Sequence, residues 1–162
     1  MVEKGADLKL IDKEDKTPFN LLYVNENPSS LDAVEFMISK GSDEWSESLR
    51  SICGCEKVSS EVISYLLNKK ADVNEAGSSD YDCSERNSLG MLCQNKNITL
   101  EALELLLSSK ADPNFKDNDG NTSLHLILEN DGYSLSFVQK LIEYKADPNI
   151  TSKLNFFSLQ VI

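Results

Sequence analysis

The stretch Lys110-Ala111-Asp112-Pro113-Asn114 returns as Lys145-Ala146-Asp147-Pro148-Asn149, and weaker copies of it lie upstream. The successive copies begin at Gly5, Gly41, Lys70, Lys110 and Lys145. By subtraction these positions are 36, 29, 40 and 35 residues apart. A unit of this length that recurs along a chain indicates stacked structural repeats. The sequence therefore predicts an elongated array with a surface along the stack, rather than a pocket around one centre.

Each unit continues with a turn and a short helix. Asp117-Asn118-Asp119-Gly120 is typical of a tight turn, because short polar side chains bond nearby backbone and glycine adopts positive φ. Thr122 can cap a helix that starts directly after it. Leu124, Ile127 and Leu128 then share one helical face. The segment therefore predicts a short helix with one buried side.

A longer helix follows after a second turn at Asp131-Gly132, and Ser134 can cap it. Its predicted buried stripe consists of Leu135, Val138, Leu141 and Ile142. The same stripe in the preceding unit consists of Leu100, Leu103, Leu106 and Leu107. Because the units repeat the order of turn, short helix, turn and longer helix, we expect an all-α fold.

These segments resemble those of a known repeat family. Thr17-Pro18-Phe19-Asn20-Leu21 and Thr122-Ser123-Leu124-His125-Leu126 are similar to the T-P-L-H-x-A signature of ankyrin repeats, and the two Ala-Asp-Pro-Asn segments resemble the G-A-D-x-N that closes each ankyrin unit. The resemblance covers essentially the whole chain. It implies an all-α, ankyrin-type solenoid of helix-turn-helix repeats with short hairpin loops. It also implies that His125 hydrogen-bonds backbone between neighbouring turns.

The domain organisation follows from the repeat spacing. We expect residues 1–162 to form a single array of about three full units flanked by two partial ones, with units that start near Gly5, Gly41, Lys70, Lys110 and Lys145. The sequence stops at Ile162, inside what resembles an inner helix with apolar residues around it. Because a terminal repeat needs a polar outer face, we expect the chain to be a slice of a longer protein.

Some positions depart from the ankyrin pattern. Lys70, Lys110 and Lys145 stand where the family usually has glycine, and a left-handed backbone there would cost each unit about 1 kcal/mol. The second unit is short and is predicted to lack a full hairpin. The third unit is long in the same region, at Gly77–Arg86. A missing hairpin beside a long one would leave a notch, and we expect partner contacts to concentrate there.

Composition restricts the partners. The formal net charge is −11, and the sequence pI is about 4.5. Nucleic acids and anionic membrane surfaces need positive charge, so a protein partner with a basic patch is expected instead. No apolar run reaches the roughly 18 residues that span a bilayer, and no signal segment stands at the start, which predicts a cytoplasmic or nuclear location without membrane insertion. The four cysteines show no metal-type spacing and are predicted to be free thiols.

No pattern of residues indicates catalysis or a bound cofactor. His125 is the only histidine, and it lacks a second histidine with which to build a metal or catalytic cluster. The phosphate-binding, dinucleotide-binding and nucleophile-elbow patterns are absent from the sequence. Asp117 and Asp119 belong to a turn too short for a calcium loop. We therefore expect no enzyme activity, no metal, no cofactor and no small-molecule substrate.

Three asparagines end the Ala-Asp-x-Asn segments, at Asn74, Asn114 and Asn149. Asparagine in such a position typically bonds its own turn, and we expect that here. The ankyrin resemblance implies an alternative, in which asparaginyl hydroxylases modify these side chains.

The resemblance also implies that partners dock on the concave side of the array, which hairpin tips and inner helices form. On the inner helices the candidate contacts are Tyr23, Val24, Asn25, Gln94, Asn95, Glu129 and Asn130. At the hairpin tips they are Asp80, Tyr81, Asp82, Asp117 and Asp119. Trp45, the only tryptophan, is either a contact at the notch or a filler of the space that the missing hairpin leaves.

The sequence thus predicts a non-catalytic protein–protein interaction module with a concave, acidic binding surface. An alternative is the regulatory or targeting segment of a larger enzyme, of the kinase or ubiquitin ligase type, whose catalytic domain lies outside this chain. A third possibility is a structural spacer in a long array.

Overall fold

The computed structural model describes Leu10, Asp12, Lys13 and residues 31–39, 45–55, 57–77, 85–132 and 134–153. These residues form seven α-helices and no β-strand, which confirms the all-α prediction. The helices are α2 (Leu31–Ser39), α3 (Trp45–Gly54), α4 (Ser60–Asn68), α5 (Ser88–Gln94), α6 (Leu100–Ser108), α7 (Ser123–Glu129) and α8 (Leu135–Glu143).

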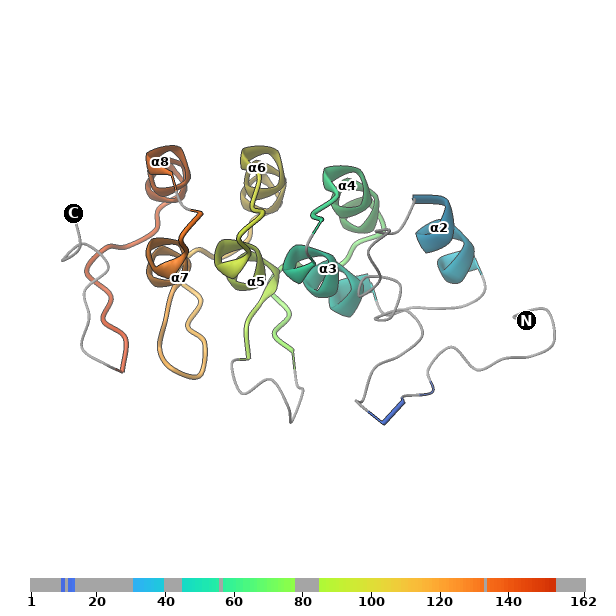
Figure 1. Cartoon of the computed structure of the whole chain (residues 1–162), viewed down its shortest axis with the longest axis horizontal. Coiled ribbons are helices and arrows are strands. Elements are labelled where there is room, and N and C mark those ends of the chain that lie inside the picture. The colour runs from blue at the N-terminus through green and yellow to red at the C-terminus, as the bar shows by residue number, and fades with distance from the viewer. Residues whose placement is uncertain are drawn as a thin grey trace.

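The helices stack in two rows (Figure 1). The inner row contains α3, α5 and α7, and the outer row contains α2, α4, α6 and α8. Each inner helix packs on the next inner helix and on the outer helix that follows it in the chain. The described segments from one outer helix to the next inner helix, residues 69–77 with 85–87 and residues 109–122, project to one side of the stack. We call them the third and fourth fingers, after the units to which they belong. The predicted helix-turn-helix solenoid is confirmed.

Side-chain caps determine where several helices begin. The Ser59 hydroxyl accepts a hydrogen bond from the Val62 N–H at 3.3 Å, and the Thr99 hydroxyl accepts one from the Ala102 N–H at 3.2 Å. Ser134 holds the predicted cap position of α8, but its hydroxyl pairs with that of Ser136 at 2.6 Å. The start of α8 was therefore predicted correctly, while its capping bond was not.

The outer helices α4, α6 and α8 end in a left-handed residue, at the three lysines that depart from the ankyrin pattern. Lys70, Lys110 and Lys145 have φ values of 72°, 70° and 71°. The next N–H then folds back to the helix, as in the 3.0 Å bond from Ala111 to the Leu106 carbonyl. This ending uses backbone geometry that glycine adopts without strain, so each lysine costs about 1 kcal/mol.

The core is a slab between the two rows. Its largest fully buried side chains are Leu49, Ile52, Ile63, Leu66, Leu89, Leu92, Leu103, Leu106, Leu124, Ile127 and Leu141. Two predicted stripes are corrected. Leu100 is 39% exposed and Leu135 is 62% exposed, because the buried face of the outer helices is rotated towards Ala102 and Phe137. Ile142 is 41% exposed, whereas Leu107, its equivalent in α6, is covered.

Candidate functional site

Asparagine side chains hydrogen-bond each unit to the next at the base of the fingers, directly after the outer helices. The Asn74 side-chain oxygen accepts the Asp112 N–H at 2.7 Å, and its amide nitrogen donates to the Lys110 carbonyl at 3.0 Å. Asn114 makes the same pair of bonds to the following unit, at 2.7 and 2.9 Å. The expectation that these two side chains bond their own turns was wrong, since an aspartate two residues earlier already bonds each turn.

The two ends of this series differ from its middle. Asn149 bonds within its own turn, but its amide nitrogen donates to the Asp147 carboxylate at 3.0 Å rather than to the turn backbone that was predicted. In the shortened second unit the Ser46 hydroxyl replaces the asparagine and accepts the Asp72 N–H at 2.8 Å. The link between units therefore persists where the sequence pattern is lost.

A second series of links joins the ends of the inner helices. The Asn95 amide nitrogen donates to the Cys53 and Cys55 carbonyls at 2.9 and 2.6 Å. One unit later, the Asn130 amide nitrogen donates to the Cys93 and Asn95 carbonyls at 3.0 and 2.8 Å. Both asparagines were candidate partner contacts, but Asn130 is only 6% exposed and both amides bond the preceding unit. Their 35-residue separation was the signal for this structural role.

Asp117 organises the fourth finger from inside. Its carboxylate accepts the N–H groups of Asp119 at 3.0 Å and Asn121 at 2.8 Å. It also accepts the Arg86 guanidinium at 3.1 Å, and the Asp117 side chain is 1% exposed. The other arm of Arg86 bonds the Gln94 side-chain oxygen. Asp117 therefore lies beneath the finger surface, and Arg86, which the sequence analysis did not select, connects two fingers and an inner helix.

Only residues 40–44 separate the end of α2 at Ser39 from the start of α3 at Trp45, and the predicted lack of a full hairpin there lies outside the described residues. Arg50 fills space at the base of the third finger, because a Cβ atom on Gly77 would collide with its guanidinium. Glu47 pairs with Arg50. Trp45 is half-buried against the core.

His125 lies buried at the start of α7. Its Nδ1 accepts the Thr122 N–H at 3.2 Å and is 2.9 Å from the Thr122 hydroxyl. An accepting Nδ1 places the proton of the neutral ring on Nε2. These contacts form a capping box within one turn. These bonds of His125 are thus structural, as expected, but they join it to Thr122 of its own turn rather than to a neighbouring turn.

The described cysteines Cys53, Cys55 and Cys93 form no disulfide and are buried at the ends of α3 and α5. Burial raises the pKa of Cys55 to about 11 and that of Cys93 to about 12, and a hydrogen bond from Ser123 opposes the latter shift. Burial also raises the pKa of Cys53, and the nearby Cys55 and Cys93 add to that shift. These thiols remain protonated at neutral pH.

The described residues form neither a metal cluster nor a membrane span. They contain no group of three or more His, Cys, Asp or Glu side chains that could hold a metal ion. None of their helices is long and apolar enough to span a bilayer.

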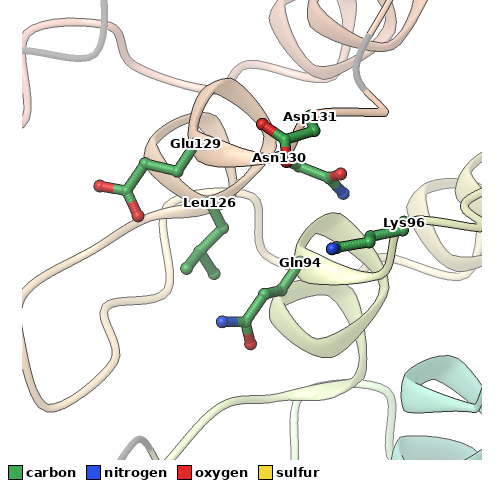
Figure 2. Close-up of a pocket in the computed structure, with 6 residues that line it drawn as sticks. All are labelled: Gln94, Lys96, Leu126, Glu129, Asn130 and Asp131. Atoms are coloured by element: carbon green, nitrogen blue, oxygen red, sulfur yellow. The ribbon is translucent and has the colours of Figure 1, made fainter.

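An open pocket lies between the ends of α5 and α7 (Figure 2). Its lining residues are Gln94, Lys96, Leu126, Glu129, Asn130 and Asp131. The structure thus brings together Gln94 and Glu129, two exposed candidates, whereas Asp119 is exposed on the fourth finger. The candidates Tyr23, Val24, Asn25, Asp80, Tyr81 and Asp82 lie outside the described residues.

Comparison with known proteins agrees with this architecture. A model of ankyrin repeats in three copies matches residues 51–152, which is more than half of the chain. A search of curated proteins found no similar sequence. With its paired helices, projecting fingers and backbone-bonding asparagines, the chain belongs to the ankyrin repeat family.

Proposed function

We propose that this chain is a non-catalytic module that binds another protein along its inner helices and fingers. Ankyrin repeats are generally protein–protein interaction modules. One observation carries the proposal for this chain. The equivalent positions of successive inner helices, Gly54, Gln94 and Glu129, are all exposed. Such a row offers a partner one continuous surface.

Pre-organisation supports this proposal. Asn74 and Asn114 fix the finger bases, while Asn95 and Asn130 fix the ends of the inner helices. A surface held at both edges loses little conformational entropy when a partner docks. Binding energy then comes from the side chains that the frame presents.

The net charge of the chain favours a partner with basic groups. Around the inner-helix ends and in the fingers, exposed acidic residues such as Glu75, Asp119, Glu129 and Asp131 stand among exposed lysines such as Lys69, Lys70, Lys96, Lys110 and Lys116. The net charge of −11 would speed association with a basic surface and make that rate sensitive to salt.

We also propose that residues 1–162 form one array, and that the long third finger takes part in binding. A cytoplasmic or nuclear location fits the three free, buried thiols, because oxidising compartments favour disulfides.

A charge reversal on the inner face tests the proposal. Affinity purification from cells followed by mass spectrometry supplies a partner, which is then purified and titrated by calorimetry. Glu129→Arg should weaken binding by about tenfold, since it reverses an exposed charge in the row. Glu101→Arg, the same change on outer helix α6, is the matched control. Unchanged affinity for Glu129→Arg together with weaker binding for Glu101→Arg would reject the inner face as the binding surface.

A further inference from the structure

We propose that the pocket between α5 and α7 receives a partner segment of mixed charge. The segment carries a basic side chain for Glu129 and Asp131, a carboxylate for Lys96, and an apolar group over Leu126. This inference rests on the proposed protein-binding function and specifies the chemistry of its partner.

The pocket has two chemically different walls (Figure 2). Gln94 and Lys96 come from the end of α5, whereas Glu129 and Asp131 come from the end of α7. Leu126 lies at the base of the pocket between them, and because it is 3% exposed it offers a partner only a small apolar area. The volume is about 220 Å³, enough for the side chains of a docked segment rather than for a large ligand.

Hydrogen bonds and close packing hold the walls together. The Asn130 amide donates across the gap to the Asn95 carbonyl at 2.8 Å. Its oxygen accepts the Gly132 N–H at 2.9 Å. Gly132 lies so close to the Lys96 carbonyl that an added Cβ atom would be 2.7 Å from it. The pocket is therefore formed before a partner arrives, and a partner can bind in it without rearrangement of its walls.

The charged groups at the pocket have no ion-pair partner among the described residues. Lys96, Glu129 and Asp131 are exposed, and none belongs to a salt bridge there. In contrast, Arg86 and Lys140 are both paired. Charges left unpaired around a pre-formed pocket are available to a partner without loss of an internal bond.

The two walls prefer opposite groups. The Gln94 oxygen already accepts the Arg86 guanidinium, so Gln94 offers a partner its two amide N–H groups. With Lys96 beside it, the α5 wall presents donors. On the other wall Glu129 and Asp131 present acceptors, and the negative end of the α7 dipole adds to their attraction for a cation. A segment of one charge sign would leave one wall unpaired, so mixed charge confers specificity.

A selection from short random peptides displayed on phage tests this inference with the purified chain as bait. The wild-type protein should enrich peptides that carry a basic and an acidic residue around an apolar one. A Lys96→Glu bait should enrich peptides that retain the base and lose the acid. A bait with Glu129→Lys and Asp131→Lys should enrich the opposite class. Each charge reversal should weaken the binding of a peptide selected on the wild-type protein by about tenfold, while Glu101→Lys on α6 should leave that affinity unchanged.

The outcomes separate the two proposals. Circular dichroism and melting temperature first establish that the variants fold. One outcome would overturn the pocket inference and leave the proposed function standing. In that outcome the Asp119→Lys bait, altered in the fourth finger, no longer binds the wild-type peptides, while the baits with reversed pocket charges enrich peptides of the same charge pattern as wild type. Peptides lost only on Gln139→Arg in outer helix α8 would overturn both. Absence of any enriched peptide would also overturn the inference.

Discussion

The third position of two neighbouring inner helices shows how one structural task has two solutions. In α7 the position holds His125, which bonds back to the backbone of the cap residue Thr122. In α5 it holds Gly90, and the cap residue Asn87 bonds forward to the Gly90 N–H at 2.9 Å. Both helices obtain a capped start, but only the α7 arrangement uses the signature histidine.

The two solutions are not equally complete. Within the described residues, the Asn87 amide nitrogen and the Ser88 hydroxyl are buried without a hydrogen-bond partner. In the next unit Ser123, the equivalent of Ser88, bonds the Cys93 thiol. A buried unsatisfied polar group costs about 1–3 kcal/mol, so α5 is the less satisfied of the two helices. The adjacent Arg86 contributes instead to the link with the fourth finger.

The largest expected effect comes from breaking that link. Asp117→Ala should lower the free energy of unfolding by about 3 kcal/mol, because it leaves the largely buried Arg86 guanidinium unpaired and removes the acceptor of two backbone N–H groups. Urea denaturation measures the change. Asp119→Ala, an exposed neighbour, is the control. Similar losses for both variants would show that Arg86 and Asp117 do not stabilise the finger.

Opposite signs are expected when the third position itself is altered. His125→Ala should cost about 2 kcal/mol, since it removes the capping box and leaves a cavity. Gly90→Ala should instead stabilise by about 0.5 kcal/mol through helix propensity, because the nearest atoms to its added Cβ are 3.4 Å away. Thermal melts of both variants give the comparison. Destabilisation by Gly90→Ala would mean that α5 requires the smaller residue.

A feature that the units share should respond in the same way in each. Lys110→Gly should stabilise by about 1 kcal/mol, because glycine adopts the φ value of 70° without strain. Lys110→Ala keeps the Cβ atom and should show no such gain. Chemical denaturation of the two variants distinguishes relief of backbone strain from loss of charge.

The smallest effect concerns pH. Cys53 and Cys93 stand in α3 and α5 where α7 has Leu128. Because their folded pKa values lie above the ordinary value of 9.0, the unfolded chain releases these protons first, and stability present below pH 9 is lost as pH rises. At pH 9 the loss is about 0.4 kcal/mol per fully buried thiol. Melting curves between pH 8 and pH 10 should show a shallower decline for Cys93→Ser than for wild type.

The fold was predictable because its signals are local and recur. Repeat spacing, turn residues and helical stripes identified the units, and the sequence marked Lys110 as a position where a left-handed backbone would be strained. The orientation of the buried face of each outer helix was less predictable. Helical periodicity places Leu135 near the stripe, but only packing against the neighbouring helices decides that Phe137 is buried instead.

The candidate site was only partly predictable for a related reason. Gln94 and Glu129 were selected because the ankyrin resemblance implies that partners dock on the inner helices, and the structure places both at one pocket. Asn130 was selected on the same grounds, yet its side chain bonds the preceding unit. Arg86 was missed because its role depends on Asp117, which lies 31 residues away. Such pairs depend on the register between units, which no single segment specifies.

The asparagine links also affect how the sequences of such arrays can evolve. Asn74 and Asn114 recognise a carbonyl and an N–H of the next unit, and Asn130 recognises two carbonyls of the previous one. These are main-chain groups, present whatever side chains the neighbour carries. The bonds therefore place no demand on the neighbour's sequence. A unit could be duplicated, deleted or exchanged while its links re-form, so the binding face is free to diversify between fixed joints.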